Sequence, residues 1–347
     1  MKAKLVLEDG TVFEGESFGA EGEKAGEVIF NTQIIGYQEI LTDPAYAGQI
    51  VAMGYPHIGN YGINDRLFES DSTHALALVV KEYSKVYSNW QAKGSLDEFM
   101  KKHGVIGIEG VDTRDLTLHI RDNGEMKGIV STKDLDSKSL LQKIKAHAEL
   151  KHETRNGSTS SPSREKSRDP KPETISKAKT VIINIGMNKS TLNAFPGAAV
   201  VAHNATAEKI MEMKPQEVII SSGPGDPRRL TGLVEEVKKL VGKVKIYGIQ
   251  NGACVLALAL GCSINRMKVG HHGMNHPVVD PKSGRGEISM QNHSYVIEKM
   301  PAGSQTVHVN LNDKTIEKFQ TKDGLCVGTL YFPIDERSKL ASGYKYV

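Results

Sequence analysis

The stretch that most constrains the fold of this chain is 244–261, where a short apolar run leads directly into a helix-forming run. Residues 244–249 have the character of a buried strand, and residues 253–260 are strong helix formers that end at Gly261. A strand, a tight turn and a helix start predict a nucleophile elbow, which presents one side chain beside unpaired helix N–H groups. The apex residue is Gln250, whose neutral amide cannot lose a proton to become a nucleophile. The sequence therefore predicts the architecture of a reactive site without its reactive atom.

Length and composition indicate a two-domain globular protein. The chain has 347 residues, of which 39% are apolar and 24% are charged. It contains no signal-peptide pattern and no apolar run of about 18 residues, so we expect a cytoplasmic protein without a membrane span. The three cysteines form no CxxC pair, which is typical of a reducing compartment and predicts no structural zinc site.

The charge of the chain is concentrated in one segment. Between Lys151 and Lys179 there are eight Lys or Arg against four Asp or Glu, whereas the net charge of the whole chain is +3. The remainder is close to neutral, and no nucleic-acid-binding face is predicted. Among the histidines, His271, His272 and His276 are the densest group. They lie in a Gly-rich segment and are interpreted as locally hydrogen-bonded residues, so no metal site is predicted.

The first 150 residues are predicted to form a β-rich domain. Alternating or apolar runs with turn signals predict strands at 3–8, 11–15, 28–30, 49–55 and 75–81. Helical spacing predicts helices at 95–103 and 113–122, the second with Asp112 as its N-cap. Residues 151–179 are rich in Ser, Pro and charged residues and are interpreted as a flexible linker, with a basic docking tail as the alternative.

The segment 180–347 alternates between strand and helix patterns. Strands are predicted at 180–185, 198–202, 217–221 and 244–249, with helices at 189–194, 207–213 and 230–241 between them. This alternation predicts an α/β domain with a central, mainly parallel sheet flanked by helices on both faces. Sites in such sheets lie at the carboxyl ends of the strands, where the loop of Gly223 and Gly225 and the elbow both fall.

Several short segments carry a resemblance to a known family, and they cover most of the chain. They are the elbow itself, residues 26–32, 36–44, 55–60, 112–114, 222–227, 270–273, 275–277 and 291–293. The elbow resembles that of class I glutamine amidotransferases, and the wider chain resembles the small subunit of carbamoyl phosphate synthetase. The resemblance implies a small-subunit N-terminal domain that helps to dock on a large subunit, followed by an amidotransferase-like domain.

The catalytic triad of that family is not matched in this chain. A glutaminase of this class uses a Cys, a His and a Glu, and the matched positions hold Gln250, Phe332 and Ile334. The resemblance also identifies the positions that would line a glutamine pocket. They are Ala45, Gly223, Gly225, Asn251, Cys254, Asn292, Ser294 and Tyr295. Of these positions, only Gly223 and Gly225 hold the residue type expected in an active enzyme.

The resemblance and the altered triad together predict a small-subunit-like protein without glutaminase activity. It would support a large subunit that makes carbamoyl phosphate for arginine and pyrimidine biosynthesis from bicarbonate, ATP and ammonia. ATP and bicarbonate would bind that large subunit, so no cofactor is expected in this chain. The alternatives are a pseudoenzyme repurposed as a binding or scaffold protein and an active glutaminase with a relocated nucleophile at Cys254. In the second alternative His293 or His272 would serve as the base, and no carboxylate partner for either can be identified from the sequence. A homo-oligomer also stays open.

The segment after Ile334 is short and polar, whereas the family continues at this point into a closing helix. We therefore expect one flank of the sheet to be uncovered or to be covered by another chain.

Overall fold

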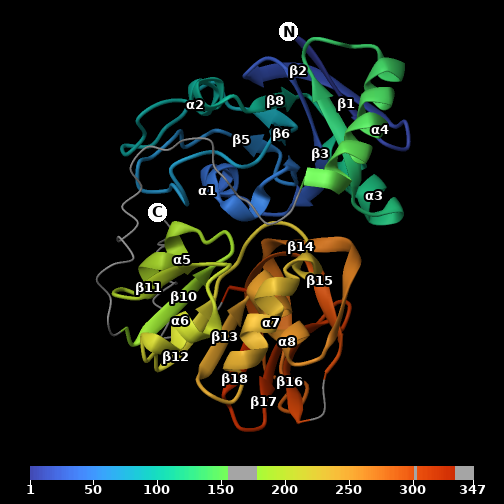
Figure 1. Cartoon of the computed structure of the whole chain (residues 1–347). Coiled ribbons are helices and arrows are strands. Elements are labelled where there is room, and N and C mark those ends of the chain that lie inside the picture. Colours follow the sequence, from blue (N-terminus) through green and yellow to red (C-terminus); the bar gives the residue numbers. More distant parts are fainter. Residues whose placement is uncertain (155–177, 301–302, 333–347) are drawn as a thin grey trace. The chain divides into compact units, whose positions relative to one another are not determined.

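The computed structural model describes residues 1–154, 178–300 and 303–332, which divide into two compact units (Figure 1). The first unit holds the described residues up to Thr154 together with the segment Lys268–Gly273, and the second holds the other described residues. Among the described helices, none is long and apolar enough to cross a membrane.

A closed barrel of short strands forms the centre of the first unit. Around the barrel the order is β1 (Lys2–Leu7), β2 (Val12–Gly19), β8 (Ile106–Glu109), β6 (Ala77–Val79), β4 (Gln49–Met53), β3 (Glu23–Asn31) and β9 (Met126–Ser131). The other elements of this unit are α1 (Tyr37–Thr42), η1 (Pro44–Tyr46), β5 (His57–Ile58), β7 (Glu82–Tyr83), α2 (Leu96–His103), α3 (Thr113–Asn123) and α4 (Ser137–Thr154). The strands and helices predicted from the sequence are present, whereas β8, β9 and the closure of the barrel were not predicted.

Local capping explains where the two predicted helices of this unit begin. The Asp112 Oδ1 atom accepts hydrogen bonds from the Arg114 and Asp115 N–H groups at 3.1 and 3.0 Å, so Asp112 is the N-cap of α3 as predicted. At the start of α2, Ser95 and Glu98 form a reciprocal capping box.

The segment Lys268–Gly273 belongs to the first unit although it lies far from it in sequence. The Glu125 N–H group donates to the Lys268 carbonyl at 2.8 Å, and the Gly270 N–H group donates to Glu125 Oε1 at 2.7 Å. His272 Nε2 lies 3.1 Å from Glu125 Oε1, and both side chains are buried. A buried imidazole–carboxylate pair therefore fixes this segment within the unit.

A nine-stranded sheet organises the second unit. Its order is β11 (Ala199–Ala202), β10 (Thr180–Asn184), β12 (Glu217–Ile220), β13 (Lys245–Ile249), β18 (Cys326–Thr329), β17 (Ile316–Thr321), β15 (Gly286–Lys299), β14 (Ser263–Val279) and β16 (Ser304–Asn310). The helical elements are α5 (Lys189–Ala194), α6 (Ala207–Glu212), η2 (Pro227–Arg229), α7 (Thr231–Leu240) and α8 (Asn251–Ala259).

The β11 to β18 half of this sheet is parallel, as the alternating sequence pattern predicted. Successive residues of its strands enter different cores. Val181 and Ile183 pack in the large cluster that includes residues of α7 and α8, whereas Ile182 packs in a smaller cluster with Phe195. Both faces of the parallel strands are therefore covered by apolar side chains.

The other half of the sheet was not predicted. Residues between Ser263 and Thr321 form long strands, and the pairings of β16, β17 and β18 are antiparallel. Charged and polar residues are frequent in these strands, which conceals an alternating apolar pattern.

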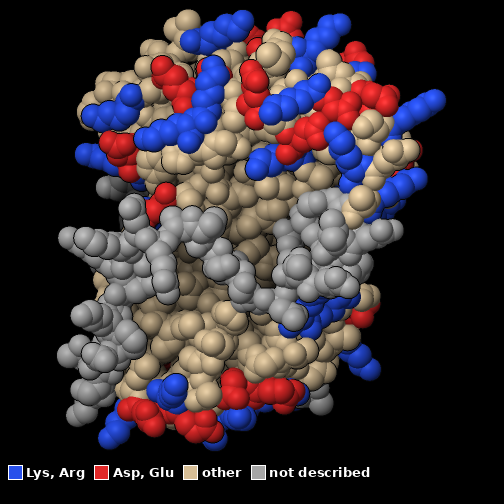
Figure 2. All heavy atoms as spheres, turned by 45° about the horizontal axis from the view of Figure 1, so that its top comes forward, with Lys and Arg blue, Asp and Glu red and all other residues tan. Residues whose placement is uncertain are grey.

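The prediction that a linker begins at residue 151 is wrong at its first residues, because α4 continues to Thr154. The rest of the predicted linker, from 155 to 177, lies outside the described residues, as do Ile334 and the tail beyond it. On the face drawn in Figure 2, basic and acidic side chains are interspersed among neutral ones.

The first prediction concerns a glycine beneath an aromatic ring. A Cβ atom at Gly328 would lie 2.2 Å from Phe319 Cε1 on the paired strand, and Phe319 is fully buried. We expect Gly328→Ala to lower the free energy of unfolding by about 1–3 kcal/mol, because the ring must shift within a packed core. The control Gly232→Ala on α7 meets no atom within 4 Å and should raise that free energy by roughly 0.5–1 kcal/mol. Urea unfolding measures both, and a fully stable Gly328→Ala protein would contradict the packing.

The second prediction concerns the carboxyl group of Glu39 on α1. Its Oε2 atom is shielded from solvent and has no hydrogen-bond partner among the described residues. Burial raises the pKa of Glu39 to about 7, and the Glu69 carboxylate adds to the rise. The folded state therefore favours the protonated acid, and the stability from this group is lost as the pH rises from 4.5 to about 7.

Glu39→Gln should therefore change stability little near pH 4 and raise the free energy of unfolding by about 2 kcal/mol near pH 8. The exposed residue Glu21 gives the control Glu21→Gln, which should show no such difference between the two pH values. Urea unfolding at both pH values tests this, and an equal effect of Glu39→Gln at both would refute it.

Candidate functional site

The turn between β13 and α8 is a nucleophile elbow in its backbone geometry. Gln250 has φ 51° and ψ −117°, a conformation that side-chain-bearing residues rarely adopt. The glycines on each side make the turn sterically feasible. A Cβ atom at Gly252 would lie 2.2 Å from the Ile220 carbonyl oxygen, and one at Gly248 would lie 2.7 Å from the Ala253 Cα atom. The predicted strand–turn–helix is therefore present, with its strain at the apex.

The apex side chain is a buried amide. Gln250 is 1% exposed, and neither its Oε1 nor its Nε2 atom has a hydrogen-bond partner among the described residues. Ser222 Oγ and Thr329 Oγ1 are also buried and have no hydrogen-bond partner among the described residues. Ser222 comes shortly after β12, Thr329 is the last residue of β18, and both strands are neighbours of β13. The carboxyl ends of three adjacent strands thus carry polar groups that stability alone does not explain, because each costs about 1–3 kcal/mol when left unsatisfied.

Asn251 links the elbow to the glycine loop after β12. Its Nδ2 atom donates to the carbonyl oxygens of Gly223 at 2.6 Å and Gly225 at 3.1 Å. Gly223 is required by close packing, because a Cβ atom there would lie 2.1 Å from the Ile185 carbonyl oxygen. The two glycines and Asn251 are therefore brought together as the sequence predicted, but the Asn251 amide is already engaged by the loop.

Tyr295 lies beside a charged pair from the same loop region. The Arg228 guanidinium lies over the Tyr295 ring, 5.4 Å from its centroid, and its Nη2 atom lies 2.7 Å from Asp226 Oδ2. Burial works against the charged form of Asp226, yet its hydrogen bonds from Arg228 lower the pKa of this carboxyl group. Burial and then the Asp226 charge raise the pKa of Tyr295. An aromatic ring and an ion pair therefore occupy this part of the site.

The remaining predicted positions fall in different places. Phe332 is buried, and its N–H group donates to the Met290 carbonyl at 3.0 Å, so an apolar ring stands where the triad requires an imidazole. Asn292 and Ser294 are partly buried on β15 of the second unit. Ala45 lies in η1 of the first unit, where its N–H group donates to Asp43 Oδ1 at 2.9 Å.

Cys254 is a packed thiol on α8. It is 0% exposed within the main apolar cluster of the second unit. Burial strongly raises the pKa of the Cys254 thiol, and the carboxylates of Asp226 and Glu317 add to the rise. A reactive cysteine requires a positive or polar environment that stabilises the thiolate, and this position has the opposite.

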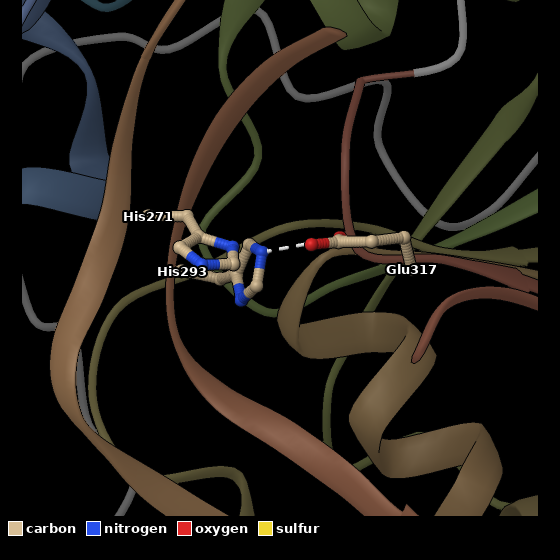
Figure 3. A group of neighbouring side chains, drawn as sticks. All are labelled: His271, His293 and Glu317. Carbon is tan, nitrogen blue, oxygen red and sulfur yellow. Dashed lines mark ion pairs between the residues drawn. The ribbon is translucent and has the colours of Figure 1, made fainter. Parts of the chain in front are cut away.

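A buried histidine–carboxylate pair lies on the antiparallel strands of the second unit. Figure 3 shows the His293 imidazole on β15 facing the Glu317 carboxylate on β17, with Nε2 and Oε2 3.5 Å apart. His293 Nδ1 lies 3.0 Å from the Tyr295 carbonyl oxygen, and Asn310 donates to Glu317 Oε1 at 3.0 Å. Such a pair can orient an imidazole for proton transfer. His271, also labelled in Figure 3, belongs to the segment Lys268–Gly273 of the first unit.

The sequence identified His293 and His272 as candidate bases but not their carboxylate partners. Glu317 and Glu125 lie far from these histidines along the chain and follow no motif. Only the strand pairing of the folded sheet and the packing of the segment Lys268–Gly273 bring each partner into reach.

Comparison with known proteins gives the class of protein that this fold and site define. Residues 190–333 match the family model "Glutamine amidotransferase class-I", and residues 5–130 match "Carbamoyl-phosphate synthase small chain, CPSase domain". The second unit is therefore a class I glutamine amidotransferase-like domain, preceded by a small-chain domain.

Relatives match over nearly the whole chain. Carbamoyl phosphate synthase small chains of Aquifex aeolicus and Archaeoglobus fulgidus are 41% and 40% identical, covering 95% and 96% of this chain and 93% of each relative. The pyrimidine-specific small chain of Bacillus subtilis is 38% identical and covers 93% of this chain and 88% of the relative. The chain belongs to the carbamoyl phosphate synthase small-chain family, as the resemblance predicted.

The third prediction measures the strain at the apex. At φ 51° the Cβ atom of an alanine clashes with its own backbone, whereas a glycine has no Cβ atom and avoids this steric cost. We therefore expect the Gln250→Gly protein to be more stable than the Gln250→Ala protein by about 1 kcal/mol, measured by urea unfolding. At the exposed helical position Glu235, the same pair of variants should differ by about 1 kcal/mol in the opposite direction. If alanine were the more stable residue at both positions, the apex would not be strained.

Proposed function

We propose that this chain is a carbamoyl phosphate synthase small chain that does not hydrolyse glutamine. It assembles with a large chain that makes carbamoyl phosphate from bicarbonate, ATP and free ammonia. The observation that carries the proposal is the identity of the residue at the apex of the elbow. Gln250 holds the strained conformation of a nucleophile, yet its side chain is a buried amide.

The other triad positions support the same conclusion. A glutaminase needs a base that takes the thiol proton and later returns it to the leaving ammonia. Phe332 cannot transfer a proton, and an isoleucine at position 334 cannot orient an imidazole. The pocket positions agree with this, because the Asn251 amide is bonded to the glycine loop and Tyr295 is covered by Arg228.

An active glutaminase with Cys254 as nucleophile is less well supported. The His293–Glu317 pair could supply a base and its orienting carboxylate, which the sequence alone did not suggest. However, the Cys254 thiol is fully buried, and the charges that act on it most strongly are carboxylates, which disfavour the thiolate. A substrate carbonyl cannot reach that sulfur without opening the apolar cluster around α8.

The partner and its reaction follow from the proposed role. The large chain would bind ATP and bicarbonate, and the product would serve arginine and pyrimidine biosynthesis. The three cysteines are free and buried, which supports a cytoplasmic location. A scaffold protein unrelated to carbamoyl phosphate is the second candidate, and the altered pocket is what favours it. Co-purification of a large chain from the native source distinguishes the two.

The fourth prediction is that the purified chain releases no ammonia from glutamine above background, with or without its large chain. Gln250→Cys alone should not restore turnover, because Phe332 still provides no proton transfer and groups that act as a unit are not additive. The new thiol should nevertheless react with iodoacetamide if the elbow N–H groups lower its pKa. The measurement is glutamine-dependent ammonia release, with a small chain that carries the complete triad as positive control.

Two outcomes would contradict this prediction. Turnover by the unmodified chain that Cys254→Ala abolishes would establish a relocated nucleophile. Robust turnover by Gln250→Cys would show that another residue, with His293 as the first candidate, already acts as the base. His293→Gln in the Gln250→Cys background would identify it.

A further inference from the structure

We propose that a loop of the first unit is the surface through which this chain binds the large chain, an inference that rests on the proposed function. The loop presents Val86, Tyr87 and Trp90, which together are called the Trp90 surface. Trp90 is 85% exposed, Val86 79% and Tyr87 39%. Trp90 is also the sole tryptophan of the chain. Placing the largest apolar side chain almost entirely in water has no stabilising role in the isolated unit.

The loop that carries the Trp90 surface is held in place by hydrogen bonds. The Ser88 N–H group donates to the Asn60 carbonyl at 2.9 Å, and the Gln91 N–H group donates to Asn89 Oδ1 at 2.9 Å. Asn64 Nδ2 donates to Gln91 Oε1 at 2.7 Å. The backbone is therefore ordered before a partner arrives, which lowers the entropy cost of binding. Exposure of Trp90 is a consequence of a fixed loop.

The surroundings of the Trp90 surface have the composition of a protein interface. Lys85 and Lys93 flank it and are exposed, so an apolar centre is bordered by positive charge. Ile34 and Ile35 are exposed just before Gly36, whose N–H group donates to Tyr61 Oη at 2.8 Å. The residue before Tyr61, Asn60, accepts the hydrogen bond from Ser88 in the loop of the Trp90 surface. An apolar centre with aromatic side chains and a polar rim is typical of protein–protein contacts. The partner should present an apolar pocket bordered by acidic residues.

The position of the loop in the sequence favours the large chain as occupant. The Trp90 surface lies within residues 5–130, which match the small-chain model, and outside residues 190–333, which match the general amidotransferase model. A feature needed for assembly with a large chain belongs in the part that distinguishes small chains from other amidotransferases. A second copy of this chain is the competing occupant.

The test uses the sole tryptophan as a probe. The full-length chain is labelled with 5-fluorotryptophan, and its single fluorine resonance is recorded during titration with the unlabelled large chain of the same source. Burial of Trp90 should shift or broaden that resonance in proportion to complex formation, which gel filtration follows in parallel. A complex that forms with an unchanged resonance would overturn the proposal.

Variants give an independent measurement. Trp90→Glu should raise the Kd for the large chain at least tenfold, and Val86→Glu should act in the same direction. The matched control is Leu118→Glu, because Leu118 is a large apolar residue of the same unit that is 45% exposed on α3. It should leave the Kd within about twofold. All three positions are exposed, so the melting temperature of each free variant should be unchanged. Thermal unfolding checks this and shows that the substitutions act on binding and not on folding.

The outcomes separate this inference from the proposed function. If the unmodified chain binds the large chain and Trp90→Glu binds equally well, the surface is elsewhere and the proposed function stands. If no complex forms with the unmodified chain, the proposed function and this surface both fall. If the fluorine resonance shifts with concentration of the small chain alone, and Val86→Glu, which keeps the labelled Trp90, abolishes that shift, the occupant is a second copy and the proposal is wrong.

Discussion

The second unit depends on one strained turn, at which the chain reverses from a central strand into a buried helix. Gln250 stands there at φ 51°, and the turn closes only because Gly248 and Gly252 let the backbones of β12, β13 and α8 approach closely. The strain places the α8 N-terminus at the carboxyl edge of the sheet. The apex itself costs stability, because it buries an amide that has no partner among the described residues.

The elbow has a structural role that is independent of the residue at its apex. The α8 helix is apolar on nearly every side and is packed within the main cluster, so its start cannot move without disturbing the core. The glycine loop is tied to the same helix through Asn251. The turn is therefore a structural joint of the parallel sheet, whichever residue stands at its apex.

The sequence predicted the parallel half of the sheet and the elbow because both are local patterns. Apolar runs such as 217–221 and 244–249, separated by helical periodicity, need no partner to be recognised. The antiparallel strands β14 and β15 were missed because their residues are largely polar and their pairing is non-local. For the same reason His293 was identified as a candidate base whereas Glu317 was not. Closure of the barrel through β8 and β9 is likewise a property of the pairing and has no local signature.

The buried pair of His293 and Glu317 has a structural role that does not depend on catalysis. Stability alone does not explain the burial of this pair, because a buried imidazole–carboxylate pair rarely stabilises a fold more than apolar side chains of the same volume would. Its hydrogen bonds to the Tyr295 carbonyl and from Asn310 instead connect β15, β16 and β17, whose polar sequences lack a strong apolar pattern. The pair therefore supplies specificity to a region where hydrophobic register is weak. The chemistry that a triad would use for proton transfer is here used to fix the register of the sheet.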